Sequence, residues 1–348
     1  MENSSRTTTV AVTGATGFIA SRCVIDLLNQ GYLVKGTVRD LELGKELKAW
    51  LAPHTSRVEN LTLYQANLLS EDGWDQAFTG CRYVLHLASP FPLLSPENEN
   101  ELIRPAVEGT RQVLEAALRN QVQRVVMTSS TAAVSYGHQD QDRVFTHKDW
   151  SDLNGSIEPY QKSKTLAEKT AWEFIRSLPE GYFMELAVVN PGYVLGPVIN
   201  HRAPTSISLH QMLMQGSLPG VARIKFNLVD VRDVSKVHLA AMTSEMAVGK
   251  RFLCVGGGIW LGEVAEILSN HFRPQGYRIP RIQFPDWFVR LYSLVDKRAR
   301  LVVKSVGKDT AYDISQTQEV LEWNPIPLKQ TIIEMGESLI EFGLINRK

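Results

Sequence analysis

The chain has 348 residues, of which 44% are hydrophobic and 21% charged, a composition typical of a globular protein with one large or two modest domains. Its 37 basic and 37 acidic residues balance, so no net field favours binding to nucleic acid or to an anionic membrane. No stretch approaches the roughly 20 apolar residues of a membrane helix, and no signal peptide is recognisable. The three cysteines are widely spaced and form no CxxC pair. We therefore expect a cytoplasmic protein without a disulfide framework or a metal site.

Strand-like and helix-like segments alternate through the first half of the chain. Strands are predicted at Thr8–Thr13, Tyr32–Val38, Leu61–Gln65, Arg82–Leu87, Arg124–Thr128 and Phe183–Val189. Helices are predicted at Phe18–Gln30, Glu46–Leu51, Ser70–Phe78, Asn98–Asn120 and Tyr160–Leu178. This alternation predicts an α/β fold, a Rossmann-type doubly wound parallel sheet whose ligands bind at the carboxyl ends of its strands.

The second half departs from this alternation. We predict a dinucleotide-binding Rossmann domain at residues 1–195, to which residues 227–256 return. Residues 196–226 and 257–348, rich in proline, glycine, methionine and aromatic residues, are predicted to form a smaller, mostly helical substrate-binding lobe. The last helix is expected at Leu328–Phe342.

A glycine turn, Thr13-Gly-Ala-Thr-Gly-Phe-Ile-Ala20, joins the first strand to the first helix. Gly14 allows the backbone to double back, and Gly17 allows it to approach a pyrophosphate closely. The helix that follows presents free N–H groups to the same anion. A glycine pattern alone is weak, but at the first strand–helix turn of an alternating chain it predicts dinucleotide binding.

The end of the second strand indicates which dinucleotide binds. NAD sites usually carry an acidic residue there, which holds the ribose 2′-hydroxyl. Here Val38 is followed by Arg39, whose guanidinium matches a 2′-phosphate, and Lys45 is expected to add charge. Asp40 would serve NAD if the strand ended one residue later, and Arg39 would then be a solvated surface residue. We favour NADPH/NADP+.

Tyr160 and Lys164 lie on one face of a predicted helix, one turn apart. Carbonyl reduction requires a proton donor, and a phenol beside an ammonium group is expected to have a lowered pKa. Ser130, after the fifth strand, would hydrogen-bond the substrate oxygen, with Ser129 as the competing choice. A tyrosine on an amphipathic helix is more often a core residue, but its position at the sheet edge favours a catalytic role.

Together these motifs resemble the extended short-chain dehydrogenase/reductase superfamily, in particular the dihydroflavonol-reductase-like aldehyde and ketone reductases. The most specific segment is Tyr160-Gln-Lys-Ser-Lys-Thr-Leu-Ala-Glu-Lys169, and similar segments cover nearly the whole chain. The resemblance implies a nicotinamide-dependent oxidoreductase with Ser130, Tyr160 and Lys164 as catalytic residues. It implies cofactor contacts from the residues Gly14, Thr16, Gly17, Phe18, Ile19, Arg39, Asn67, Leu68, Ala88, Ser89, Tyr160, Lys164, Pro191 and Val194.

Three positions depart from the pattern of these relatives. Asn67 replaces the usual acidic residue before Leu68, and Ala106 stands where many members have an asparagine. Ser135 replaces the asparagine with which the flavonoid reductases hold a phenol ring. We therefore do not expect dihydroflavonol as the substrate.

The substrate pocket is expected to be apolar and aromatic, suited to a bulky neutral ketone or aldehyde. Its candidate residues are Phe91, Pro92, Leu93, Ser135, Tyr136, Tyr193, Met212, Met214, Trp260 and Trp287, about half of which would be core residues instead. Two other functions stay open: an NAD-dependent nucleotide-sugar epimerase or dehydratase, and a non-catalytic NADPH-binding regulatory protein. A small-molecule substrate is the expected partner. A helix-rich surface could also support a homodimer.

Overall fold

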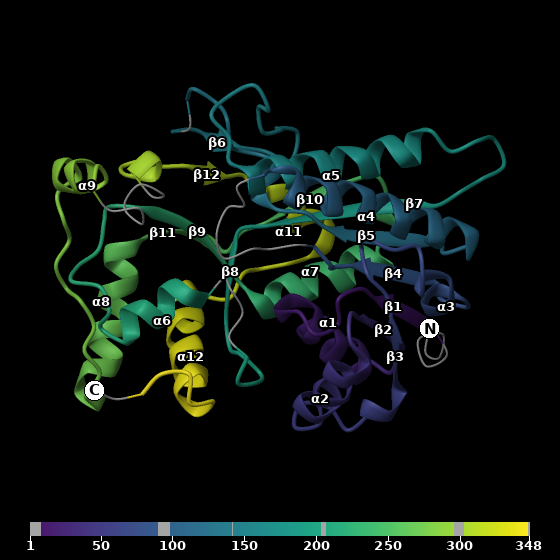
Figure 1. Cartoon of the computed structure of the whole chain (residues 1–348), viewed down its shortest axis with the longest axis horizontal. Helices are drawn as coiled ribbons and strands as arrows, with labels where there is room; N and C mark the ends of the chain where they lie inside the picture. The colour runs from purple at the N-terminus through teal and green to yellow at the C-terminus, as the bar shows by residue number, and fades with distance from the viewer. Residues whose placement is uncertain (1–7, 90–97, 141, 203–206, 296–302, 347–348) are drawn as a thin grey trace.

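A seven-stranded parallel sheet forms the centre of the molecule (Figure 1), in a computed structural model that describes residues 8–89, 98–140, 142–202, 207–295 and 303–346. Its strand order is β10-β7-β5-β4-β1-β2-β3. The strands are β1 (Thr9–Val12), β2 (Leu33–Val38), β3 (Leu61–Gln65), β4 (Tyr83–His86), β5 (Arg124–Thr128), β7 (Glu185–Pro191) and β10 (Arg251–Cys254). The order reverses at β1, as in a doubly wound sheet, so the expected fold class is confirmed.

Helices cover both faces of the sheet. The first face packs against α1 (Phe18–Asn29), α2 (Leu41–Leu51), α7 (Val231–Thr243) and α11 (Ser315–Leu321). The second face packs against α3 (Trp74–Phe78), α4 (Asn100–Arg119) and α5 (Pro159–Arg176). Alternate residues of β1 enter opposite cores: Val10 and Val12 join the first, and Ala11 joins the second. This period of two explains why a strand buried on both sides is apolar throughout.

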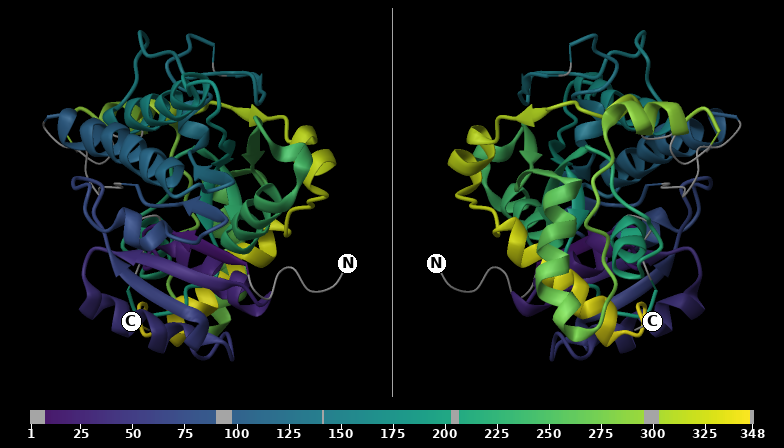
Figure 2. Two further views of the ribbon diagram at one scale, coloured as in Figure 1. Left: turned by 90° about the vertical axis from the view of Figure 1, so that its right-hand side faces the viewer. Right: turned by 90° about the vertical axis from the view of Figure 1, so that its left-hand side faces the viewer.

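A smaller lobe lies beside the carboxyl edge of the sheet (Figures 1 and 2). It contains a second sheet, ordered β11-β9-β8, and helices that share one core. Its elements are β8 (Tyr193–Leu195), β9 (Lys225–Asp230), β11 (Gly257–Trp260), α6 (Ser208–Met214), α8 (Leu261–Phe272), α9 (Asp286–Tyr292) and α12 (Leu328–Glu341). Within residues 227–256, β9 pairs with β8 and β11, whereas α7 packs against the large sheet and β10 is one of its strands.

A two-stranded ribbon joins distant parts of the chain. Its strands, β6 (Val144–Phe145) and β12 (Ala311–Tyr312), are parallel. Phe145 is fully buried and its ring lies 6.2 Å from that of Tyr312. The ribbon thereby brings a residue from the carboxyl-terminal part of the chain to the edge of the main sheet.

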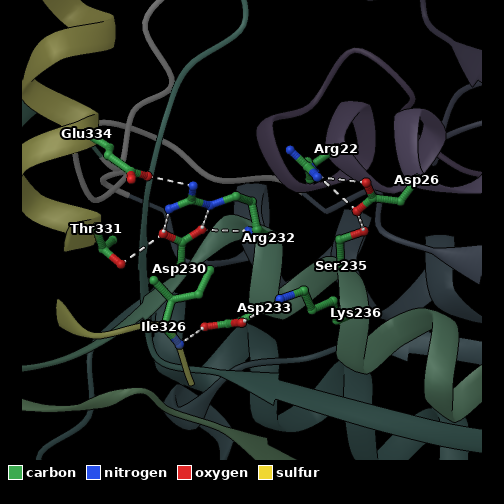
Figure 3. A network of polar contacts seen from close by, with 10 residues as sticks. All are labelled: Arg22, Asp26, Asp230, Arg232, Asp233, Ser235, Lys236, Ile326, Thr331 and Glu334. Carbon is green, nitrogen blue, oxygen red and sulfur yellow. Dashed lines mark hydrogen bonds and ion pairs between the residues drawn. The ribbon is translucent and has the colours of Figure 1, made fainter. Parts of the chain in front are cut away.

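Helix α7 connects the two lobes through charged contacts (Figure 3). Arg232, at its start, makes a bidentate ion pair with Asp230 at 2.8 and 2.6 Å. It also pairs with Glu334 of α12 at 2.5 Å, while Thr331 of α12 donates a hydrogen bond to Asp230 at 2.8 Å. One turn further along α7, Ser235 donates to Asp26 of α1 at 2.6 Å. The helix is thus fixed both to the carboxyl-terminal helix and to the first helix of the main sheet.

We expect Arg232→Met to destabilise the protein by about 3 kcal/mol, because it leaves the buried carboxylate of Asp230 without its countercharge. The Asp230 side chain has no exposed surface, whereas that of Arg232 is 20% exposed. Urea unfolding measures the change. The double variant Asp230→Asn, Arg232→Met is the control and should recover part of the lost unfolding free energy. An unfolding free energy of Arg232→Met within about 0.5 kcal/mol of wild type would contradict the role of Arg232 as the countercharge.

Candidate active site

A cleft of about 1070 Å³ opens at the carboxyl ends of the strands in the main sheet. It extends from the glycine turn to the wall formed by β9 and β12. It brings together most of the residues predicted from the sequence. These are Gly14, Thr16, Gly17, Phe18, Ile19, Arg39, Asn67, Leu68, Ala88, Ser89, Ser130, Ser135, Tyr136, Tyr160, Lys164, Pro191, Tyr193 and Val194.

Several predicted residues lie elsewhere. Lys45 is on the outer side of α2, where its amine pairs with Glu42 at 2.7 Å, and it does not line the cleft. Met214 is 1% exposed in the core of the smaller lobe, where α6 packs it against Gly336 of α12. Met212, Trp260 and Trp287 do not line the cleft either. Phe91, Pro92 and Leu93 lie outside the described residues.

The glycine turn is held by two threonines that sequence reasoning missed. Thr13 Oγ1 accepts hydrogen bonds from the backbone N–H groups of Leu87 and Ala88, at 3.0 and 2.9 Å. Thr37 Oγ1 accepts from the Gly14 N–H at 3.1 Å. Gly14 itself has φ +65°, and a Cβ there would lie 3.2 Å from Ala88. The turn therefore requires glycine and is fixed against the ends of β2 and β4.

Helix α1 begins at this turn without a side-chain cap. Its N-cap is Gly17, and no side chain accepts a hydrogen bond from the first helical N–H groups. By contrast, Asp40 caps α2 and Asp230 caps α7. The start of α1 therefore presents N–H groups and a partial positive charge to the cleft, as an anion-binding helix terminus does.

Arg39 and Asp40 have different roles in the structure. Strand β2 ends at Val38, and the Asp40 carboxylate accepts a hydrogen bond from the Glu42 N–H at 2.9 Å. Asp40 does not line the cleft, whereas Arg39 does. Within the described residues, the Arg39 side chain forms no ion pair. Asp40, the acidic residue that could have held an NAD ribose, thus caps α2, and the guanidinium group of Arg39 lies at the end of β2.

The two serines after β5 are also distinguished by their contacts. Ser129 is 3% exposed and donates to Glu168 at 2.6 Å. Ser130 Oγ accepts from the Ala132 N–H at 3.1 Å, which leaves its hydroxyl proton available. A hydrogen bond from Ser130 to Tyr160 favours the ionised phenol. Of the two serines, Ser130 is therefore the one connected to Tyr160.

Helix α5 places Tyr160 and Lys164 at the wall of the cleft. Pro159 begins the helix, and a capping box between Glu158 and Gln161 fixes its first turn. The Lys164 ammonium donates to the Thr128 carbonyl at 3.5 Å. Both side chains of the pair thus face the end of β5.

Burial decides the pKa values of this pair. It raises the pKa of Tyr160 to about 12 and lowers the pKa of Lys164 to about 8. The expected lowering of the phenol pKa is therefore wrong for this structure, because the loss of hydration exceeds the effect of the Ser130 hydrogen bond. Near neutral pH the phenol carries its proton and Lys164 is mainly an ammonium group.

The opposite end of the cleft is more polar than expected. Ser135 Oγ and the Tyr312 hydroxyl lie 2.6 Å apart, and Asn227 Nδ2 donates to the Thr310 carbonyl at 2.9 Å. The rings of Tyr193 and Phe226 pack 5.4 Å apart. Sequence reasoning missed the residues that β9 and the carboxyl-terminal segment contribute, namely Lys225, Phe226, Asn227, Lys308, Thr310 and Tyr312.

No cluster of three or more histidine, cysteine or acidic side chains is arranged to hold a metal ion in the described ranges. Within those ranges no helix combines the length and apolar character needed to cross a membrane.

Comparison with known proteins gives consistent matches. The model of the NAD dependent epimerase/dehydratase family matches residues 10–255. An anthocyanidin reductase of Vitis vinifera is 34% identical over 78% of this chain and 82% of its own length. A cinnamoyl-CoA reductase of Medicago truncatula is 33% identical over 99% of this chain and 100% of its own length. The structure of yeast methylglyoxal/isovaleraldehyde reductase Gre2 complexed with NADPH superposes with a TM-score of 0.81 and 27% identity, covering 96% of this chain and 99% of that one.

Proposed function

Because the chain belongs to the NAD dependent epimerase/dehydratase family, as its resemblance to the extended short-chain dehydrogenases predicted, we propose that it is an NADPH-dependent carbonyl reductase. It reversibly converts a bulky ketone or aldehyde to the alcohol. The observation that carries this proposal is the placement of Ser130, Tyr160 and Lys164 in the same cleft as the glycine turn. The matched relatives are themselves named as reductases.

The residues of the cleft fit NADPH. The uncapped start of α1 and the glycine turn suit a pyrophosphate, and Arg39 suits a 2′-phosphate. Leu68 and Ala88 would lie beside the adenosine, and Pro191 and Val194 beside the nicotinamide. The residues that precede β8, with α7, β10 and α11, would form the cofactor-binding domain, and the smaller lobe would close the substrate end.

The reaction adds two hydrogens across a carbonyl bond. NADPH, when bound, would supply the hydride for the carbonyl carbon and would be oxidised to NADP+. The Tyr160 hydroxyl donates its proton to the carbonyl oxygen, and the Ser130 hydroxyl stabilises the negative charge that develops there. The Lys164 ammonium stabilises the phenolate that Tyr160 becomes, which then takes a proton from solvent.

The lining of the cleft bears on the substrate and on the alternatives. Tyr193 and Phe226 offer an aromatic surface, and the hydroxyls of Ser135 and Tyr312 offer hydrogen bonds, so an aryl or similarly bulky carbonyl compound fits best. A nucleotide-sugar substrate would need cations for its diphosphate, and of the two lysines that line this end, Lys225 and Lys308, the first is paired with Asp309. A non-catalytic regulator would not need the contact between Ser130 and Tyr160.

Turnover assays with the purified protein test the proposal. Aryl ketones, aldehydes and keto esters are offered with NADPH or NADH, and cofactor absorbance and alcohol product are measured together. We expect alcohol formation in step with NADPH consumption and a preference over NADH. Tight cofactor binding without turnover of any carbonyl compound would overturn the proposal.

The pH dependence follows from the two pKa values. Tyr160, with a pKa of about 12, stays protonated, so its ionisation does not change the reduction rate below about pH 10. Lys164, with a pKa of about 8, loses its positive charge as the pH rises. We expect kcat/KM for reduction to be constant below about pH 7 and to fall by tenfold per pH unit above about pH 8. A profile that rises through this range would contradict the role given to the Lys164 ammonium.

A further inference from the structure

A buried carboxylate lies directly behind the proposed catalytic residues. Glu168 is on α5 one turn after Lys164, its side chain has no exposed surface, and it does not line the cleft. A charge so far from water is strongly unfavourable unless several hydrogen-bond donors surround it. The reaction proposed above does not use Glu168, so the burial of this carboxylate needs another explanation.

Four donors from different segments surround this carboxylate. Ser129 Oγ donates at 2.6 Å, Asn190 Nδ2 at 2.7 Å, Arg251 Nε at 2.5 Å and Trp172 Nε1 at 3.2 Å. Ser129 follows β5, Asn190 is in β7 and Arg251 begins β10. A single side chain of α5 is therefore bonded to the ends of two neighbouring strands and the start of a third.

The donors adjoin the residues of the site. Ser129 directly precedes Ser130, and Asn190 directly precedes Pro191. Asn190 Nδ2 also donates to the backbone carbonyl of Ser130 at 3.2 Å. A displacement of the carboxylate would therefore be transmitted to the proposed catalytic serine and to the expected nicotinamide contact.

Arg251 supplies the countercharge and fixes a further segment. Its Nη1 donates to the carbonyls of His147 and Asp149 at 2.8 and 2.6 Å. Its guanidinium group lies 3.8 Å from the ring centre of Trp150. The ion pair is thus held from both sides, and Glu168 is the member bonded to Ser129 and Asn190.

We propose that Glu168 is a positioning residue, whose buried carboxylate holds Ser130, Lys164 and Pro191 in their relative places. The kinetic consequences of this role rest on the proposed reductase function. The hydrogen-bond network around Glu168 is independent of that function. Positions matter here, since a misplacement of about 1 Å can lower a rate about a hundredfold.

Glu168 also acts on the charge of Lys164. Tyr160 precedes Lys164 by one turn of α5, and Glu168 follows it by one turn. His86 of β4 interacts electrostatically with Lys164, and the Lys164 ammonium donates to the carbonyl of Thr128, whose hydroxyl pairs with His238 of α7 at 2.6 Å. Burial lowers the pKa values of His86 to about 3 and of His238 to about 4, so both are neutral. The negative charge of Glu168 raises the pKa of Lys164 against the effect of burial.

The test compares Glu168→Gln with Glu185→Gln. Glu185, whose side chain is 13% exposed, forms an ion pair with Arg124 at 2.6 Å. The two residues begin β7 and β5, at the opposite ends of these strands from Asn190 and Ser129. For Glu168→Gln we expect kcat to fall by about ten- to a hundredfold with KM for the carbonyl changed less than about threefold. We also expect the decrease of kcat/KM at alkaline pH to begin at a lower pH than in the wild-type protein. Glu185→Gln should lower only the melting temperature.

Hydrogen exchange on the protein without cofactor gives a readout that is independent of turnover. Backbone amides at 129–134 and 192–194 should exchange faster in Glu168→Gln and stay unchanged in Glu185→Gln. If Glu168→Gln does not fold, Ser129→Ala, which removes one donor and keeps the ion pair, takes its place, with a smaller loss of kcat expected.

Two results separate the failure of this inference from that of the proposed function. Equal kinetics, pH profiles and exchange in the two glutamine variants would overturn the positioning role. Absence of carbonyl turnover in the wild-type protein would overturn the proposed function, and the exchange experiment alone would then decide the positioning role.

Discussion

Replacing Tyr160 with phenylalanine is expected to lower kcat for carbonyl reduction by about a thousandfold, within the range by which general acids accelerate reactions. The phenol is the proton donor to the carbonyl oxygen, and its pKa of about 12 keeps it protonated at every working pH. Phenylalanine retains the ring and removes only the hydroxyl. Cofactor affinity should therefore change little, because the glycine turn and Arg39 lie at the other end of the cleft.

The measurement is steady-state turnover together with a fluorescence titration of NADPH. Tyr182→Phe is the matched control, because Tyr182 is 61% exposed and does not line the cleft. A Tyr160→Phe protein with near-wild-type activity would show that the proton comes from another group.

Replacing Arg39 with glutamine is expected to weaken NADPH binding by about ten- to a hundredfold, the equivalent of one or two charge-assisted hydrogen bonds. NADH lacks the 2′-phosphate, so its affinity should change by less than about threefold. Arg39 lines the cleft at the end of β2, where the alternative acidic residue, Asp40, already serves as the cap of α2.

Dissociation constants for both cofactors, measured at one ionic strength, test this expectation. Lys45→Gln is the control, since Lys45 pairs with Glu42 on an exposed helix and lies outside the cleft. Equal losses for NADPH and NADH in Arg39→Gln, or equal effects of the two substitutions, would contradict the assignment of Arg39 to the phosphate.

The main sheet could be predicted from the sequence because its determinants are local. Apolar β-branched runs, helical periodicity and a glycine turn lie within short windows, and the predicted strand at Arg124–Thr128 matches β5 in the structure. The second sheet and the ribbon of β6 and β12 could not be predicted. Their strands are only two to six residues long and pair segments far apart in the chain, such as Val144 with Ala311.

The same distinction applies to the site. Residues on the glycine turn and on α5 were predicted because their motifs are contiguous. Tyr312 and Asn227 were missed because tertiary contacts alone bring them to the cleft. Met214 was predicted in the substrate pocket because an apolar side chain on a short helix fits a pocket and a core equally well. In the structure it packs against α12 in the core of the smaller lobe. The surroundings of Glu168 come from four segments and leave no pattern in the sequence.

Transfer of deuterium from NADPH that carries deuterium at both positions of the reactive carbon of its nicotinamide tests the reductase assignment most directly. The protein is incubated with the best carbonyl compound, and the product is analysed by mass spectrometry. The structure predicts one deuterium on the carbon that bears the new hydroxyl group, in an amount equal to the NADP+ formed. A protein that binds NADPH but places no deuterium in any alcohol product, while converting a nucleotide sugar without net cofactor consumption, would contradict it.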